Sequence, residues 1–501
     1  MTWWRDAVVY QIYPRSFCDS NADGVGDLNG VRRRLRYLQW LGIDAIWLSP
    51  IYPSPMRDFG YDVSNYVDVD PTFGSLRDFD LLVHEAHELG IRVVLDWVPN
   101  HTSSEHPWFL DARSSRTSRH RDWYIWRDAK PDGSLPNNWI HAWSEESVWT
   151  WDELTGQYYL HMFLADQPDL NWSNPEVRDA MGETLRFWLD RGVDGFRMDV
   201  VHALGKDIER DDPDELRMLC HTPFNDVEVT HDYIREIRHV LDEYEGERVS
   251  VGEVYLLDPA RVATYYGKGD ELHLSFNFKS LFTAWRANAW LDLIGETESA
   301  FGPVSGWPTW VLSNHDNVRV ATRLGGQDRV RTAMTLLMAL RGTPFLYAGE
   351  ELGLEDALVA PEQVVDPGGR DGCRAPIPWT SDEDHGWLAG AWLPFAAEPS
   401  KFCVSSQEVS PGSMLQFTRR LLALRRESTA LRRGDTVGSH VDGEVLVFDR
   451  VHGDEVFRVL VNFASSPSNV DVAGATLLFS SVDRPTRGEL AGNEAAIYRL
   501  S

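Results

Sequence analysis

The sequence has little cysteine and contains no long hydrophobic run. Its four cysteines are too few and too scattered for a disulfide framework, and none lies in a CxxC metal motif: Cys18, Cys220, Cys373 and Cys403. The N-terminal stretch MTWWRDAVVYQIYPRSF lacks the basic and apolar regions of a signal peptide, and no segment approaches the ~18 apolar residues of a membrane helix. These absences predict reduced thiols, a cytoplasmic location and no membrane partner.

Basic residues are also scarce. There are 48 Lys and Arg against 77 Asp and Glu, so the formal net charge is −29, and no basic excess is left to neutralise the phosphates of a nucleic-acid partner. The 501 residues are 43% hydrophobic and 25% charged, which excludes a disordered or collagen-like chain. Aromatic residues reach 12%, including 21 Trp. Such rings suit the faces of sugars, but composition alone favours their use in cores.

Short runs rich in β-branched and aromatic residues alternate with stretches of helical periodicity. The runs lie at 8–13, 44–50, 92–99, 195–200, 249–256, 272–276, 309–314 and 343–349. Eight strands alternating with helices predict an α/β fold, a (β/α)₈ TIM barrel. The alternative is a doubly wound open sheet, but no GxGxxG motif follows the first strand.

Two regions depart from the alternating pattern. Residues 101–171 are rich in Trp, Asn, Pro and Gly, and such a length is too great for a structureless loop, so we expect an excursion domain after the third strand. From residue 429 short alternating segments predict a C-terminal antiparallel β-sandwich domain over 429–501. The barrel itself is then expected over 1–100 and 172–428.

Polar clusters stand at the ends of several predicted strands. The carboxyl ends of barrel strands face one pocket, so Arg197, Asp199 and Glu253 should meet there. A pair of carboxylates on neighbouring strands suits retaining glycoside hydrolysis, with one as nucleophile and one as acid/base. Arg197 is expected to lower the pKa of Asp199 and keep it anionic. The alternatives are an ion-paired barrel rim, or a metal hydrolase, which Arg197 disfavours because it would repel a cation.

A second candidate site lies near the N-terminus. The run DSNADGVGD places oxygen donors at the spacing of a calcium loop, with a glycine at the sharp turn: Asp19, Asn21, Asp23, the carbonyl of Val25, and Asp27. The usual bidentate Glu at the end of such a loop is replaced by Gly30. We expect a structural Ca²⁺, with Mg²⁺ as the alternative ion and a metal-free turn as the alternative structure. No organic cofactor is expected.

Four segments together resemble the signature regions of the α-amylase family of glycoside hydrolases. They are DWVPNH (96–101), GFRMDVVH (195–202), GEVYL (252–256) and SNHDN (313–317), and QPDLN (167–171) resembles a further region of the α-glucosidase and oligo-1,6-glucosidase branch. The order and spacing match, and the resemblance extends over essentially the whole chain. It implies a barrel with an excursion domain and a C-terminal β domain.

The resemblance also implies roles for individual residues. By position, Asp199 matches the nucleophile, Glu253 the acid/base and Asp316 the carboxylate that stabilises the transition state. The residues that match substrate-binding positions are His101, Arg197 and His315, the pair Asp58 and Tyr61, Arg370 opposite Asp58, and the aromatic platforms Trp143 and Phe163. An Asp58–Arg370 bridge would close the pocket and restrict attack to chain ends, whereas the alternative is a surface ion pair.

The predicted activity is that of an exo-acting, retaining α-glucosidase on short oligosaccharides or glucosides, with transglucosylation. Val200 and QPDLN are reminiscent of α-1,6-cleaving members, whereas Val254 and the run GGRDGCR look more like α-1,4-active ones. We favour α-1,4 linkages. The alternatives are an oligo-1,6-glucosidase, a trehalose- or sucrose-converting transglycosylase or isomerase, and a non-catalytic binding relative. The expected assembly is a monomer or homodimer.

Overall fold

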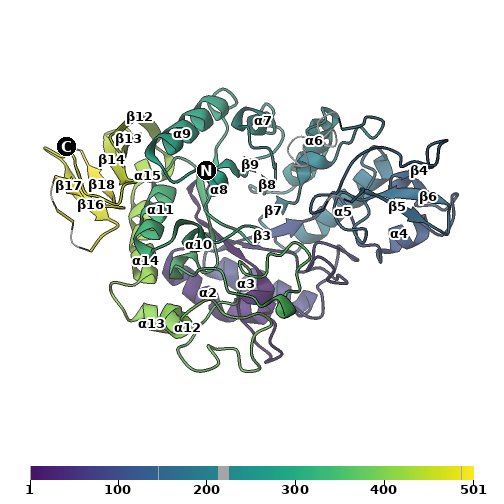
Figure 1. Ribbon diagram of the computed structural model, residues 1–501, viewed down its shortest axis with the longest axis horizontal. Helices are drawn as coiled ribbons and strands as arrows, with labels where there is room; N and C mark the ends of the chain where they lie inside the picture. Colours follow the sequence, from purple (N-terminus) through teal and green to yellow (C-terminus); the bar gives the residue numbers. More distant parts are fainter. Residues whose placement is uncertain (1, 145, 213–224, 484, 487, 501) are drawn as a thin grey trace.

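A computed structural model describes residues 2–144, 146–212, 225–483, 485–486 and 488–500. Its largest sheet has eight parallel strands that form a barrel at the centre of the molecule (Figure 1). In chain order they are β1 (Val9–Ile12), β2 (Ala45–Leu48), β3 (Arg92–Trp97), β7 (Gly195–Met198), β8 (Val249–Gly252), β9 (Leu274–Ser275), β10 (Thr309–Val311) and β11 (Thr343–Tyr347). Each lies within a predicted run, so the (β/α)₈ prediction is confirmed.

Side-chain hydroxyls, not a main-chain ladder, join the two ends of the barrel sheet. Hydrogen bonds join the strands in the order β10-β11-β1-β2-β3-β7-β8-β9, which leaves β10 and β9 at the two ends. The hydroxyl of Thr309 connects them, since it donates to the carbonyl oxygen of Ser275 at 2.9 Å and accepts from the N–H of Asn277 at 3.3 Å. We call this contact the β9–β10 seam.

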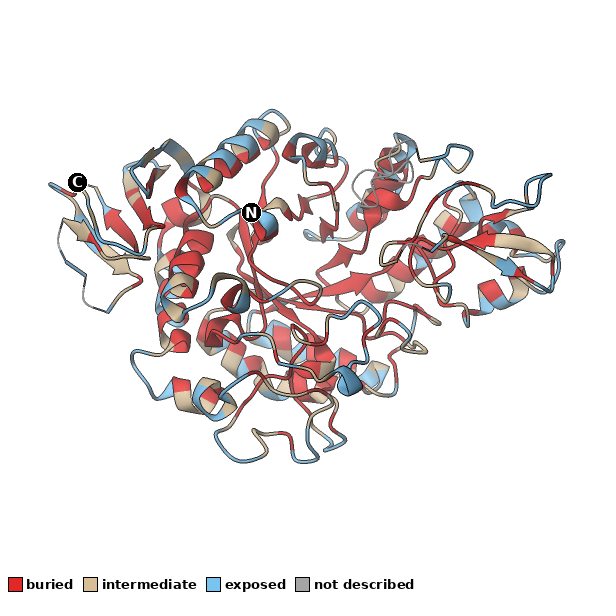
Figure 2. Ribbon diagram, in the orientation of Figure 1, coloured by how far each residue is buried: buried red, intermediate tan, exposed pale blue. Residues whose placement is uncertain are grey.

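Helices follow the strands and cover the outside of the barrel, with their inner faces buried (Figure 2). The first of them, α2, begins after Asp27, whose carboxylate accepts the N–H of Gly30, and ends at Gly42, whose φ of 108° only glycine adopts readily. The principal helices are α2 (Leu28–Leu41), α3 (Leu76–Glu88), α5 (Pro175–Leu189), α6 (Val229–Asp242), α7 (Pro259–Thr264), α9 (Ala287–Phe301), α11 (Gln327–Ala339) and α14 (Met414–Glu427). Shorter helices are α1 (Trp3–Asp6), α8 (Lys279–Phe282), α10 (Val320–Leu324), α12 (Pro399–Phe402), α13 (Val404–Glu408) and α15 (Thr429–Arg433).

The stretch between β3 and α5 forms a small unit of its own at one end of the molecule (Figure 1). It contains α4 (Pro107–Ala112) and an antiparallel sheet in the order β4 (Trp126–Arg127), β6 (Gln157–Leu160), β5 (Trp149–Asp152). Trp139 and Trp149 are buried in a cluster with Ile125 and Leu160. These tryptophans therefore fill a core, as the composition suggested.

The C-terminal region is an antiparallel β domain at the opposite end of the molecule (Figure 1). Its main sheet has the order β12 (Asp435–Asp442), β13 (Val445–His452), β14 (Glu455–Asn462), β18 (Ala495–Arg499), β16 (Thr476–Ser480), and the second layer is the pair β15 (Ser468–Asn469) and β17 (Glu489–Leu490). The buried Arg450 of β13 donates to the carbonyl of Ala339, at the end of α11, and to that of Gly434. One side chain thus connects the sheet to a helix of the barrel.

The structure describes three of the four cysteines. Cys18, Cys373 and Cys403 are free and buried, and Cys220 lies outside the described residues. Among the residues that the structure describes, no helix is both long and apolar enough to cross a membrane.

A buried ion pair fixes the excursion to the barrel. The ammonium group of Lys206, which follows β7, donates to Oδ1 of Asn100 at 2.8 Å and lies 3.3 Å from Oδ2 of Asp169. Asp169 also accepts the N–H of Met162 at 3.1 Å. Burial raises the pKa of Asp169 to about 6 even though Lys206 opposes that shift. The lysine therefore neutralises a carboxylate that water does not reach.

We expect Lys206→Met to lower the free energy of unfolding by about 3–5 kcal/mol, because it leaves Asp169 buried without its cation. The loss should grow as the pH rises above about 6, since loss of Lys206 raises the folded-state pKa of Asp169 further and stability gained by a retained proton disappears at higher pH. Urea unfolding of the variant and of the exposed control Lys401→Met measures it. Adding Asp169→Asn should restore part of the stability, and a Lys206→Met variant as stable as the control would contradict this account.

Candidate active site

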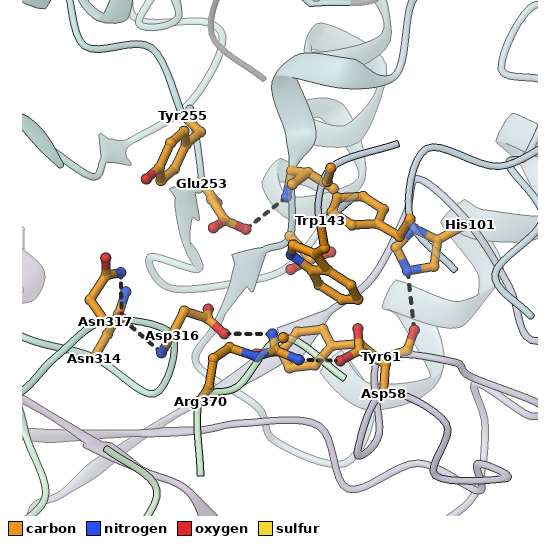
Figure 3. Close-up of a pocket in the computed structure, with 15 residues that line it drawn as sticks. Asp58, Tyr61, His101, Trp143, Glu253, Tyr255, Asn314, Asp316, Asn317 and Arg370 are labelled. Atoms are coloured by element: carbon orange, nitrogen blue, oxygen red, sulfur yellow. Dashed lines mark hydrogen bonds and ion pairs between the residues drawn. The ribbon is translucent and has the colours of Figure 1, made fainter. Parts of the chain in front are cut away.

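A cavity of about 340 Å³ lies where the carboxyl ends of the barrel strands meet the excursion. Figure 3 shows its lining side chains converging on one space. The lining residues are Asp58, Tyr61, His101, Ala142, Trp143, Phe163, Asp199, Val200, Glu253, Tyr255, Asn314, Asp316, Asn317, Gly368 and Arg370.

Arg197 lies beneath the cavity and binds three carboxylates. Its Nη1 donates to Oδ1 of Asp96 at 2.9 Å and to Oδ1 of Asp199 at 2.7 Å, and its Nη2 donates to Oε2 of Glu253 at 2.6 Å. Residues 197 and 199 are two apart at the end of β7, so their side chains leave the same face of the strand. Because β8 pairs with β7, Glu253 arrives beside them. The two carboxylates predicted to carry the chemistry thus share one guanidinium.

The electrostatics of Asp199 differ from the prediction. Burial, together with the nearby Glu253 and Asp96, raises the pKa of Asp199 well above its ordinary value, and the lowering effect of Arg197 does not outweigh these influences. The expectation that Arg197 would hold this pKa down was wrong, because one guanidinium serves three buried carboxylates. The pKa of Asp199 therefore depends on the whole group of buried carboxylates around Arg197 and not on Arg197 alone.

Asp316 lines the same cavity, and Figure 3 shows it together with Glu253. Its Oδ1 accepts Nη1 of Arg370 at 2.9 Å and Nη2 of Arg374 at 3.1 Å. Burial alone would raise the pKa of Asp316, but His315 and the two arginines outweigh it and hold the pKa well below its ordinary value. Asp316 is therefore an anion whenever the protein is folded near neutral pH.

Arg370 closes one end of the cavity. Its Nη2 donates to Oδ1 of Asp58 at 2.6 Å, and its guanidinium lies 4.7 Å from the ring centre of Trp143. Asp366 accepts the Nε of Arg370 at 2.8 Å and so anchors the guanidinium from behind. Burial raises the pKa of Asp58 to about 6, although Arg370 opposes the shift. The pair is buried and not a surface ion pair, which settles the alternative raised by the sequence.

Rings and a neutral imidazole form the remaining wall. His101 is fully buried, and burial lowers its pKa to about 3, so it is uncharged. Its Nε2 lies 3.2 Å from the carbonyl oxygen of Tyr61, to which it can donate, and Nε2 of the neighbouring Gln167 donates to Oδ2 of Asp58 at 3.0 Å. Phe163 packs against His101 with ring centres 5.2 Å apart. This wall can offer flat surfaces and hydrogen bonds to a neutral ligand.

The structure brings most predicted site residues to the cavity. Those that line it are Asp58, Tyr61, His101, Trp143, Phe163, Asp199, Glu253, Asp316 and Arg370. Arg197 and His315 are buried one layer behind it. Sequence reasoning missed Gln167, Asp366 and Arg374. All three lie in or beside motifs already quoted, so their positions, though not their partners, could have been found.

The N-terminal loop adopts tight turns stabilised by its own acidic side chains. Asp19 accepts the N–H groups of Asn21, Ala22 and Gly24, and Asp27 accepts those of Ser20 and Gly30. The φ of Gly24 is 87°, which fits the expected sharp turn. Among the described residues, no group of three or more His, Cys, Asp or Glu side chains is arranged to hold a metal ion. Ca²⁺ at this loop stays a prediction.

Comparison with known proteins agrees with this geometry. The sequence pattern of the alpha-amylase catalytic domain matches residues 11–434. The chain belongs to the alpha-amylase family. It is therefore a glycoside hydrolase, and the predicted resemblance is confirmed.

Individual relatives indicate which branch of the alpha-amylase family the chain resembles. The chain is 43% identical to a "Probable alpha-glucosidase" of Rhizobium meliloti (94% of this chain, 91% of the relative) and 35% identical to an "Oligo-1,6-glucosidase" of Parageobacillus thermoglucosidasius (99% of both). Among solved structures, the alpha-glucosyl transfer enzyme XgtA superposes with a TM-score of 0.95 at 40% identity over all of both chains. A trehalose-6-phosphate hydrolase of Bacillus licheniformis superposes with a TM-score of 0.90 at 31% identity, again over all of both chains.

Proposed function

We propose that this chain is an exo-acting, retaining α-glucosidase that removes terminal non-reducing α-linked glucose from short oligosaccharides and also transfers it to acceptors. The observation that carries the proposal is the closed end of the cavity. The buried Asp58–Arg370 pair bridges the wall of the cavity that Asp199 and Glu253 also line, and we infer that it blocks that end so that only a chain end fits. Relatives named alpha-glucosidase and oligo-1,6-glucosidase support the same activity.

The reaction follows from the positions of the carboxylates. Asp199 attacks the anomeric carbon while Glu253 donates its proton to the glycosidic oxygen, which leaves with the bond electrons. Water then adds to the anomeric carbon, gives its proton to Glu253 and releases Asp199. An acceptor hydroxyl in place of water gives transfer. Asp316, held anionic by two arginines, binds ring hydroxyls and stabilises the positive charge that develops on the sugar.

The charges around the cavity favour an uncharged substrate. Among the described lining residues, Arg370 alone is a lysine or arginine, and its guanidinium already binds Asp58 and Asp316. A phosphorylated disaccharide would bring a second negative charge toward Asp199 and Glu253 without a cation to receive it. We therefore propose a neutral glucoside, with α-1,4 linkages favoured.

A product-resolved assay on maltose, isomaltose, sucrose, trehalose and p-nitrophenyl α-glucoside tests the proposal. We expect glucose from maltose, and no cleavage of a maltooligosaccharide whose non-reducing end is blocked. Isomaltose cleaved far faster than maltose would favour an oligo-1,6-glucosidase, and rearranged sucrose or trehalose would favour an isomerase or transglycosylase. Cleavage of the end-blocked substrate would refute exo action.

The pairing of Arg370 with Asp58 leads to a separate prediction. Arg370→Ala should lower kcat/KM for maltose by roughly 10²-fold or more, because it leaves Asp58 buried without its guanidinium partner and removes one of the two arginines that bind Asp316. Arg370→Lys retains the charge but not the forked geometry, so its loss should be intermediate. Steady-state kinetics measure both variants, and an unchanged KM and kcat in Arg370→Ala would contradict the assigned role.

For the N-terminal loop we propose a structural Ca²⁺, with Mg²⁺ as the alternative. The donor set of three carboxylates, one amide and one carbonyl is the hard-oxygen set that these ions prefer. Adding a chelator should lower the melting temperature while kcat of the folded protein stays the same, and Ca²⁺ should reverse the change. Calorimetry checks this, with Asp23→Asn as the matched variant. An identical melting temperature with and without chelator would mean that the loop needs no ion.

A further inference from the structure

Gln11 is a buried amide beneath the cavity that the proposed reaction does not use. It lies on β1 and is 1% exposed. Its Nε2 is 2.7 Å from Nδ1 of His315 and 3.3 Å from the hydroxyl oxygen of Ser49. An amide nitrogen can donate but not accept, so Nδ1 of His315 must be the acceptor. The ring proton of a neutral His315 then lies on Nε2.

The contacts at the other edge of the imidazole require the same assignment. Nε2 of His315 is 2.6 Å from the hydroxyl oxygen of Tyr61, and that oxygen is 3.0 Å from Oδ2 of Asp96. With the proton on Nε2, His315 donates to Tyr61 and faces Oδ2 of Asp316 at 3.3 Å. Tyr61 donates to Asp96, so each contact joins a donor to an acceptor. With the proton on Nδ1, the single hydroxyl proton of Tyr61 would have to serve both Nε2 and Asp96.

The surroundings of His315 fix the position of its ring and keep it uncharged, so only the choice of tautomer is left open. Its ring is fully buried between Tyr13 and Tyr61, with ring centres 5.9 and 5.4 Å away and interplanar angles of 21° and 10°. Burial lowers its pKa to about 3, and Arg374 and Arg197 act in the same direction against Asp316. The ring is therefore neutral near neutral pH, and a neighbouring group must select one of its two neutral tautomers.

The far end of this chain of hydrogen bonds reaches the reacting groups. Tyr61 lines the cavity and donates a hydrogen bond to Oδ2 of Asp96. The Oδ1 atom of Asp96 accepts a hydrogen bond from Arg197. Arg197 in turn binds Asp199 and Glu253. A reversed tautomer would turn the Tyr61 hydroxyl away from Asp96 and change the charge that Arg197 balances.

We propose that Gln11 is a positioning residue that holds His315 in the Nε2–H tautomer and thereby directs the hydroxyl of Tyr61 to Asp96. Its effect on turnover rests on the proposed function. The tautomer itself is a property of the free protein and is independent of the proposed function.

The tautomer can be read directly. In two-bond ¹⁵N–¹H spectra of the full chain labelled at histidine, the signal of His315 is the one lost in His315→Gln. We expect Nε2 protonated and Nδ1 unprotonated in the unmodified protein, without change between about pH 5 and pH 8. In Gln11→Glu the carboxylate can only accept, so the proton should move to Nδ1. A protonated Nδ1 in the unmodified protein, or an unchanged tautomer in Gln11→Glu, would overturn the proposal.

Kinetics supply the second measurement. Gln11→Glu and Gln11→Met should lower kcat/KM roughly 10- to 100-fold, the usual effect of removing a partner that orients a functional group. Gln11→Glu should also show a changed pH profile, because its His315 can take a second proton. Ser49→Ala removes the other partner of the same amide and should keep both the tautomer and kcat/KM. If the unmodified protein hydrolyses no glucoside, the proposed function fails while the spectra still decide the role of Gln11.

Discussion

Asp199→Asn is expected to lower kcat for maltose by on the order of 10⁴-fold or more, with the fold intact. An amide has no charge with which to attack the anomeric carbon, so the first step loses its nucleophile. Stability should not suffer, because Arg197 would then balance two buried carboxylates in place of three. Steady-state kinetics give the loss, and thermal unfolding gives the melting temperature, which we expect to be equal or higher.

Azide distinguishes loss of a nucleophile from general damage to the site. In Asp199→Gly, azide can occupy the vacated space and attack an activated α-glucoside such as the fluoride directly, so the product should be the β-glucosyl azide. Arg370→Lys serves as the matched control, since it alters the pocket but keeps Asp199. Turnover of Asp199→Asn within tenfold of the unmodified protein, or an α-azide from Asp199→Gly, would exclude Asp199 as the nucleophile.

Glu253→Gln should show the second largest effect, and it should depend on the leaving group. For maltose, whose leaving sugar needs a proton, we expect kcat to fall about 10²–10⁴-fold. For p-nitrophenyl α-glucoside the leaving phenolate needs no proton, so the glucosyl-enzyme should form readily and then persist because no base activates water. A rapid burst of nitrophenol followed by slow turnover is the expected signature in stopped-flow absorbance.

The matched experiment for Glu253 also uses azide, but the product is expected to have the opposite anomeric configuration. Azide added to Glu253→Ala should attack the accumulated glucosyl-enzyme and give the α-glucosyl azide, whereas Asp199→Gly gives the β form. Equal losses on maltose and on the nitrophenyl substrate, without a burst, would show that Glu253 does not donate the proton.

The barrel could be predicted because its strands are encoded locally. Each is a short buried run, such as residues 92–99, which contains β3, and the helices begin and end at caps like Asp27 and Gly42 that can be read from the chain. The second layer of the C-terminal domain was harder to foresee. The strands β15 and β17 have two residues each, too short for an alternating pattern to stand out.

The residues of the site were predictable, but only some of their interactions were. Motifs placed Asp199, Glu253 and Asp316 at strand ends, and the structure gathers them around one cavity. The raised pKa of Asp199 could not be derived, because it depends on how many buried carboxylates share Arg197. The family resemblance implied the bridge between Arg370 and Asp58, whereas the hydrogen bond from Gln167 to Asp58, 109 positions apart, is visible only in the fold.

The β9–β10 seam divides the proposed catalytic groups unequally. Asp199 and Glu253 follow β7 and β8, which a continuous ladder of main-chain hydrogen bonds holds in register. Asp316 follows β10, across the seam from them, where the hydroxyl of Thr309 forms the connection. Small opening motions of the barrel should therefore concentrate there. They would shift Asp316 relative to Asp199 and Glu253 and leave the spacing of those two carboxylates unchanged.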